Sequence, residues 1–293
     1  MYFSESELIL NPDGSIYHLN MRPEQLADTV ITVGDPDRVE EVTKYFDCIT
    51  DRTQHREFVA HTGFFSQKRI TVISTGIGTD NIDIVLNELD ALANIDFATR
   101  TLKPQLKSLN IIRIGTSGCV QADIPLDTIL ATEYAFGMDA LGAHYAAIAE
   151  NPFGDIQQFC VENALFSPKE TPQDVHFLYG AAADKTLLQQ FAHDLPKGFT
   201  VTAPGFYAPQ GRFLRTAGVN THFIPQLAAW RLQHNHRITN LEMETAGIYA
   251  LANIMGHKAL SINALLANRI TKTFSKQAEK TVDKAIQLIL ERV

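Results

Sequence analysis

The chain has 293 residues, of which 45% are hydrophobic, so it is long enough to bury a full-sized core. Its net charge of −8 argues against a nucleic-acid partner, because binding a phosphate backbone requires clustered Lys and Arg. The three cysteines are far apart, which argues against a disulfide framework, and the acidic N-terminus does not resemble a signal peptide. No apolar run is long enough to span a bilayer, so we expect a cytoplasmic globular protein.

β-Branched runs alternate with amphipathic segments from the start of the chain. Residues 29–33 are expected to form a strand, followed by a helix with Asp35 at its N-cap and Pro36 at its first position. A second strand over 69–75 leads into a helix whose apolar residues between 82 and 93 follow the 3.6-residue period.

The alternation continues to the C-terminus. Further strands are expected at 110–114, 128–134, 175–179, 199–203 and 259–266, and further helices at 224–233, 241–255 and 277–291. The irregular stretch 142–171 is typical of a surface insertion. We therefore expect an α/β protein, a three-layer α/β/α sandwich with a central mixed, largely parallel sheet, folded as a single domain over residues 1–293.

Ligands of such sheets bind beyond the carboxyl ends of the strands. Three Gly-rich turns are expected there, at 34–38, 76–78 and 113–118. Glycine lets the backbone approach an anion, and Arg38 and Arg113 supply paired donors for phosphate oxygens. Any one turn taken alone is better explained as an ordinary strand-to-helix connection. None matches a Walker A or GxGxxG sequence, so the turns do not favour a nucleotide cofactor.

Two further groups of polar residues are candidates for a sugar and a base. Thr239 and Glu242 fit a capping box, whereas Glu244 is left to accept two ribose hydroxyls or to lie on a solvated helix face. Gln210 offers one donor and one acceptor to a pyrimidinedione edge, and Arg212 offers donors to a carbonyl oxygen. An exposed aromatic-proline loop explains the latter pair equally well.

Five short motifs follow one another along the chain. They are Gly34-Asp-Pro-Asp-Arg38, His55-Arg56-Glu57-Phe58, Arg113-Ile-Gly-Thr116-Ser-Gly118, Gln210-Gly-Arg212 and Glu242-Met243-Glu244. As an ordered set they are highly specific, and residues 17–293 resemble the uridine phosphorylase branch of the nucleoside phosphorylase superfamily.

The resemblance implies a role for each matching residue. The implied phosphate site is Gly34, Arg38, Arg113 and Thr116, together with Arg56 from a neighbouring subunit. The implied ribose contacts are Met243, Glu244 and a neighbour's His18, and the implied base contacts are Phe206, Gln210, Arg212 and Arg269. Arg113, Glu244 and Arg212 would carry catalysis, with phosphate as co-substrate and without a metal or cofactor.

The implied reaction is phosphorolysis of uridine, and also of 2′-deoxyuridine, to uracil and ribose 1-phosphate. The implied assembly is a homo-oligomer whose active sites are shared between subunits, either a dimer or a hexamer. Bacterial members bind a monovalent cation at the dimer interface. Thr79-Asp80-Asn81 replaces the expected Gly/Pro/Ser-rich turn there, which counts against that cation although Glu57 is retained.

Three other functions compete with this one. A purine nucleoside phosphorylase of the same fold carries an Asp after the late strand, but this chain has no Asp or Glu between Thr245 and Ala278, and the matching stretch begins at Asn263. A nucleoside hydrolase would not need the phosphate-type arginines. A non-catalytic nucleoside sensor would not need Arg56.

Overall fold

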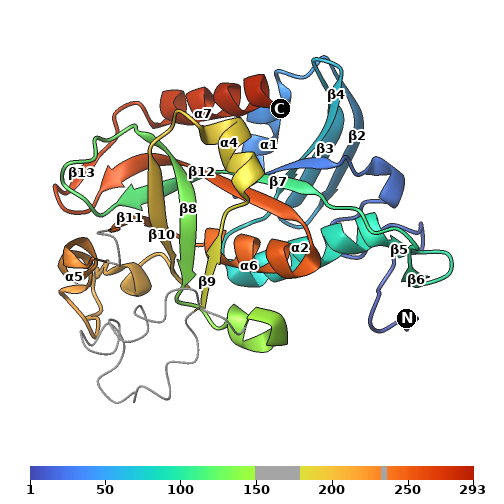
Figure 1. The fold of residues 1–293 in the computed structure, drawn as a ribbon, viewed down its shortest axis with the longest axis horizontal. Coiled ribbons are helices and arrows are strands. Elements are labelled where there is room, and N and C mark those ends of the chain that lie inside the picture. The colour runs from blue at the N-terminus through green and yellow to red at the C-terminus, as the bar shows by residue number, and fades with distance from the viewer. Residues whose placement is uncertain (149–178, 232–235) are drawn as a thin grey trace.

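The computed structural model describes residues 1–148, 179–231 and 236–293 (Figure 1). An 11-stranded mixed sheet runs through it, with helices on both faces. Helices α2 (Thr79–Asn94) and α6 (Thr245–Met255) pack together on one face, and α1 (Asp37–Thr43), α4 (Lys185–Ala192) and α7 (Ala278–Arg292) cover the other. The expected three-layer α/β class and mixed sheet are confirmed.

The large sheet contains all but two of the described strands. They are β1 (Thr29–Val33), β2 (Cys48–His55), β3 (Phe58–Phe65), β4 (Lys68–Ser74), β7 (Asn110–Cys119), β8 (Ile129–Gly137), β9 (Tyr179–Ala182), β10 (Lys197–Thr202), β11 (Ile238–Glu242), β12 (Lys258–Asn268) and β13 (Thr273–Phe274). Strands β5 (Ile95–Asp96) and β6 (Thr101–Leu102) form a separate pair, and α5 (Phe223–Ala229) lies beside β11. No helix in the described ranges is long and apolar enough to cross a membrane.

Strand β7 joins the two halves of the sheet. One edge of β7 pairs in parallel with β12 along its whole length. The other edge pairs in parallel with β1 as far as Ile114 and antiparallel with β11 from Gly118 onward. Because β12, β8, β10 and β11 pair in turn, these four strands and β7 close into a small barrel.

The structure corrects several expected boundaries. The expected Gly-rich turn at 113–118 is wrong, because β7 continues through these residues to Cys119 alongside β12. The expected helix at 241–255 begins at Thr245, since residues 238–242 are a fully buried strand. Thr239 therefore does not cap a helix, and its hydroxyl donates to the Phe199 carbonyl of β10. Asp35 lies one residue before the N-cap Pro36 and accepts the Asp37 N–H.

The strands β2, β3, β5, β6 and β13 and the helix α4 are additional to the expected elements. The expected insertion lies largely outside the described residues, as do most of the expected strand at 175–179 and the end of the expected helix at 224–233. The remaining elements lie within a few residues of their expected places.

Candidate active site

A cavity of about 860 Å³ opens at the carboxyl ends of the central strands. Nine residues singled out from the sequence line it together, namely Gly34, Arg38, Arg113, Thr116, Phe206, Gln210, Arg212, Met243 and Glu244. They come from positions more than two hundred residues apart in the chain. The fold therefore assembles most of the expected site in one place.

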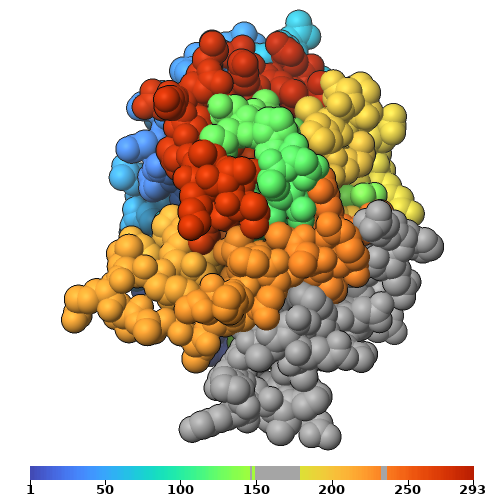
Figure 2. Space-filling view, turned by 90° about the vertical axis from the view of Figure 1, so that its left-hand side faces the viewer, coloured from blue at the N-terminus to red at the C-terminus, as the bar shows by residue number. Residues whose placement is uncertain are grey.

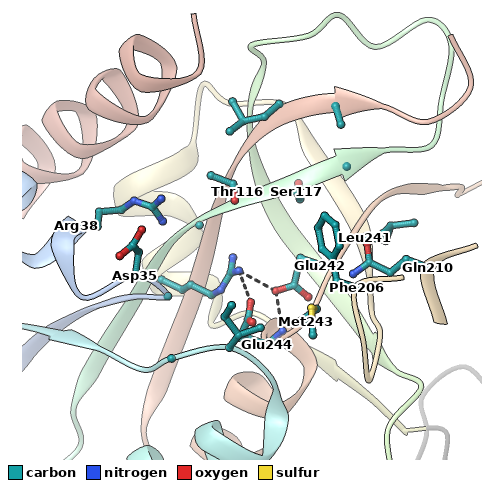
Figure 3. Close-up of a pocket in the computed structure, with 18 of the residues that line it drawn as sticks. Asp35, Arg38, Thr116, Ser117, Phe206, Gln210, Leu241, Glu242, Met243 and Glu244 are labelled. Carbon is teal, nitrogen blue, oxygen red and sulfur yellow. Dashed lines mark hydrogen bonds and ion pairs between the residues drawn. The ribbon is translucent and has the colours of Figure 1, made fainter. Parts of the chain in front are cut away.

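The cavity lies where β1 and β11 separate on the same edge of β7. Gly115, Thr116 and Ser117 fall between the end of the β1 pairing and the start of the β11 pairing, and all three line the cavity. Figure 3 shows Arg38 at one end of the cavity, Phe206 and Gln210 at the other, and Thr116, Met243 and Glu244 between them. Figure 2 shows that the segment after β10, in orange, and the C-terminal segments, in red, adjoin one another on one face of the molecule.

Arg38 is a largely buried cation at one end of the cavity. Its side chain is 17% exposed, and its ion pair with Glu41 is long, at 3.8 Å. Within the part of the chain that the structure describes, its buried Nε atom has no hydrogen-bond acceptor. Burial lowers the pKa of Arg38, although an arginine stays protonated near neutral pH. A buried donor without an acceptor at a cavity wall suits an anionic ligand.

Arg113 lies in the middle of the site and is bound by four side chains. Its Nη2 atom is 2.6 Å from Glu244 Oε2 and 3.1 Å from Glu242 Oε2. Its Nη1 atom donates to Asn263 Oδ1 at 2.9 Å and to Ser261 Oγ at 3.3 Å. The two carboxylates outweigh burial and raise the pKa of Arg113. Arg113 is therefore a fixed positive charge.

Glycine at position 115 makes room for this arginine. A Cβ atom on Gly115 would lie 2.0 Å from Arg113 Nη1, which is far inside van der Waals contact. The guanidinium therefore packs directly on the backbone of its own strand. Any side chain at position 115 would displace it.

The two glutamates of the late motif have different contacts. Glu244 Oε1 accepts the Gly78 N–H at 3.0 Å while Oε2 binds Arg113, and burial raises the Glu244 pKa. Glu242 Oε2 accepts the Thr245 N–H at 2.9 Å, so this carboxylate caps α6 from the end of β11. A carboxylate has about four lone-pair sites, so Glu244 can accept ligand hydroxyls as well.

The opposite end of the cavity joins an amide, a guanidinium and an aromatic ring. Arg212 Nη1 donates to Gln210 Oε1 at 2.5 Å and to the Phe206 carbonyl at 2.8 Å. The Arg212 guanidinium lies over the Phe206 ring, 4.0 Å from its centroid, and burial lowers the Arg212 pKa. Because Gln210 Oε1 faces Arg212, its amide N–H groups are oriented for other partners.

Arg269 does not line the cavity, in contrast to the other implied base contacts. It lies behind the loop, where its Nη1 donates to the Gln210 carbonyl at 2.9 Å and its Nη2 to the Gly211 carbonyl at 3.3 Å. Burial, followed by the neighbouring Arg212, lowers the pKa of Arg269 to about 10. Arg269 therefore supports the loop that carries Gln210 and Arg212.

We expect Arg269→Ala to reduce kcat/KM for the nucleoside by about tenfold, because the loop would lose two charge-assisted hydrogen bonds that orient Gln210. Arg269→Lys, which retains the positive charge and a single ammonium group as donor, should lose less. Steady-state kinetics with both substrates varied would measure this, and the KM for phosphate should change little. Unaltered kinetics in Arg269→Ala would contradict the supporting role.

His18 and Arg56 lie outside the cavity of their own chain. Arg56 is exposed in the two-residue turn between β2 and β3, with φ of 54°. His18 packs edge-to-face against Phe58 at the start of β3, with 6.4 Å between ring centroids. The two candidate residues for a neighbouring pocket are therefore both near this turn.

Several cavity residues escaped the sequence analysis as site candidates. They include Asp35, Glu57, Ile77, Ser117, Leu241, Leu266, Ala267 and Phe274. Most are apolar or belong to turns and carry no chemical signal of their own. Asn263 does not line the cavity but did carry a signal in the sequence, because an amide in the middle of an apolar strand needs a buried partner. Here the partner is Arg113.

Residues 28–293 match the Phosphorylase superfamily. The chain belongs to this superfamily. It is 28% identical to a uridine phosphorylase of Thermococcus kodakarensis, over 99% of this chain and 92% of that protein. It is 25% identical to a DeoD-type purine nucleoside phosphorylase of Bacillus subtilis, over 94% of this chain and 98% of the relative.

A solved structure agrees with the sequence comparison. The nucleoside phosphorylase of Trypanosoma brucei, which shows uridine phosphorylase activity, superposes with a TM-score of 0.84. The two chains are 28% identical, and the match covers 97% of this chain and 98% of the other. The superfamily fold therefore extends over nearly the whole of this chain.

Proposed function

We propose that this protein is a uridine phosphorylase, which uses phosphate to split uridine into uracil and ribose 1-phosphate. The observation that carries the proposal is one cavity with two different ends. At one end Arg38 Nε has no acceptor among the described residues, and at the other end lies the Gln210–Arg212 pair. The names of the relatives from Thermococcus kodakarensis and Trypanosoma brucei support the same substrate.

The phosphate end of the site is proposed to use Arg38, Thr116 and the backbone at Gly34. Arg113 adds fixed positive charge, although its terminal nitrogens already bind protein groups. The phosphate oxygen attacks C1′ of the ribose while the glycosidic bond breaks, and the bonding electron pair leaves with the base. Glu244, aligned by Arg113 and Gly78, is placed to accept ribose hydroxyls beside Met243.

The base end receives the negative charge that develops on uracil. The Gln210 amide N–H groups and the Arg212 guanidinium donate to the base carbonyls, much as an oxyanion hole receives charge. The second lone pair of Gln210 Oε1 can accept the uracil N3–H. Each charge-assisted hydrogen bond contributes on the order of 1.5–3 kcal/mol to stabilising the leaving uracil anion. Because several such bonds act together, no protein nucleophile or cofactor is proposed.

Uracil is favoured over a purine because this chain lacks the late-strand acid that the purine branch uses to protonate the purine ring. Between Thr245 and Ala278 the sequence contains no Asp or Glu. The Asn263 side chain is engaged with Arg113 through Oδ1 and with Thr132 through Nδ2. A purine would leave without protonation, whereas uracil leaves as a delocalised anion.

We expect base release from uridine that depends on phosphate, with inosine and adenosine as poor substrates. An assay of a nucleoside panel with and without phosphate measures this directly. Equal rates without phosphate would instead support a hydrolase, and faster cleavage of inosine would support a purine enzyme. Absence of turnover with any nucleoside would support a sensor.

The working unit is proposed to be at least a dimer, with Arg56 and His18 completing the neighbouring pocket. Both residues lie outside the cavity of their own chain, and the chain as a whole is acidic. Arg56 from a neighbour would strengthen the positive field at the phosphate end.

A further inference from the structure

Glu88 of α2 binds the N-terminal segment that carries His18. Its Oε1 atom is 2.7 Å from His18 Nδ1, and its Oε2 atom accepts the Leu19 N–H at 2.8 Å. The His18 N–H lies 3.1 Å from both carboxylate oxygens. The Glu88 side chain is only 12% exposed. One nearly buried carboxylate thus receives three N–H groups from two consecutive residues.

These contacts set the hydrogen positions on the imidazole. An ionised carboxylate only accepts hydrogen bonds, so Nδ1 of His18 must carry a hydrogen. In the neutral ring Nε2 is then the acceptor, the atom with which His18 can bind a hydroxyl. Tyr17 and Phe58 restrict the ring further through edge-to-face contacts, with centroids 4.7 Å and 6.4 Å away.

The same segment is attached to the strand that leads to Arg56. His55 Nδ1 donates to the His18 carbonyl at 3.2 Å, and the Thr53 hydroxyl donates to the Leu19 carbonyl at 3.4 Å. Both donors belong to β2, whose last residue precedes Arg56. His18 is therefore held between α2 and β2, close to the turn that carries Arg56.

We propose that Glu88 is a positioning residue for the neighbouring subunit's active site, because it fixes the tautomer and orientation of the histidine that reaches that site. The inference rests on the proposed shared active site. Glu88 does not line the cavity of its own chain, so it acts through His18 and not by touching substrate there.

Two substitutions at Glu88 separate its charge from its shape. Glu88→Ala removes all the acceptors, and we expect kcat/KM for uridine to fall by about 100-fold because His18 would lose its alignment. Glu88→Gln retains one acceptor oxygen, and we expect a fall of about tenfold. In both variants the KM for phosphate should stay within about twofold, since the ribose end is affected. Glu279→Ala, an exposed change on α7, should leave the kinetics unaltered.

Mixing subunits tests whether Glu88 acts across the interface. Glu88→Ala chains are mixed with Arg38→Ala chains, whose lesion lies in their own pocket. In the mixed dimer the pocket with intact Arg38 receives an intact His18 and Glu88 from its partner. With statistical exchange, activity should return to about a quarter of the wild-type value. His18→Ala mixed with Arg38→Ala is the reference and should recover equally.

The outcomes separate the inference from the function on which it rests. Recovery with His18→Ala but not with Glu88→Ala overturns the role of Glu88 and leaves the shared site intact. Failure of both mixtures overturns the shared site and the inference together. Wild-type kinetics in both Glu88 variants also overturn the proposal. Glu88→Gln replaces Glu88→Ala in the mixtures if melting curves show that the alanine variant does not fold.

Discussion

Replacing Arg113 with alanine is expected to cost the protein both stability and activity. In the wild-type protein Arg113 Nη2 lies 3.1 Å from Glu242 Oε2 and 2.6 Å from Glu244 Oε2. The change would leave these two buried carboxylates without their cation. Removing one partner of a buried ion pair typically costs about 3–5 kcal/mol. We expect a loss of that size in the free energy of unfolding, measured by urea denaturation, and a fall of at least about 100-fold in kcat/KM.

Arg38→Ala is the matched control. Arg38 lines the same cavity, but its ion pair with Glu41 is long and its partner is half exposed. Pairs of that kind contribute about 0–1 kcal/mol to stability. Activity should fall by about 100-fold, equivalent to about 2.7 kcal/mol of transition-state stabilisation, while the unfolding free energy stays within about 1 kcal/mol.

A compensated variant distinguishes the two roles of Arg113. Arg113→Met combined with Glu242→Gln and Glu244→Gln removes all three charges together, so much of the lost stability should return. Activity should not return, because the positive charge at the proposed phosphate site and the Glu244 carboxylate proposed to accept the ribose hydroxyls are both missing. An unfolding free energy of Arg113→Ala within 1 kcal/mol of wild type would contradict the buried-pair explanation.

The strands that could be predicted from the sequence are those with apolar residues on one face or on both faces. Residues 29–33 are β-branched and become β1, a buried parallel strand whose side chains pack on both faces. β2 was missed because its exposed side chains are polar and only every second residue is partly buried. Periodicity also could not separate β11 from α6, because Leu241 fits the apolar face of either element.

The candidate site could be predicted only as a set of separate turns and motifs. Their sequence order was visible, but the contacts between them were not. Arg113 meets Ser261 and Asn263 about 150 residues further along the chain because β12 pairs with β7 in exact parallel register at those positions. No local pattern predicts that pairing, and for the same reason the supporting position of Arg269 behind Gln210 appeared only in the structure.

The interface role of Arg56 can be tested by mixing inactive subunits, because activity then either returns or stays absent. Arg56 is exposed at the β2–β3 turn and does not line the cavity of its own chain. If it completes the phosphate site of the neighbouring subunit, both Arg56→Ala and Arg38→Ala homo-oligomers should be nearly inactive. In a mixed dimer, however, one pocket carries both lesions and the other carries neither. Activity should therefore return to about a quarter of the wild-type value after statistical exchange.

Arg38→Ala mixed with Arg212→Ala is the control for this experiment. Both residues line the cavity of their own chain, so every pocket of a mixed dimer keeps one lesion and the mixture should stay inactive. Native mass spectrometry of the mixed dimer confirms that subunits have exchanged. If the Arg56→Ala mixture behaves like this control despite exchange, Arg56 serves its own pocket. The site would then gather its phosphate charge within one acidic chain, from Arg38, Arg56 and the already paired Arg113.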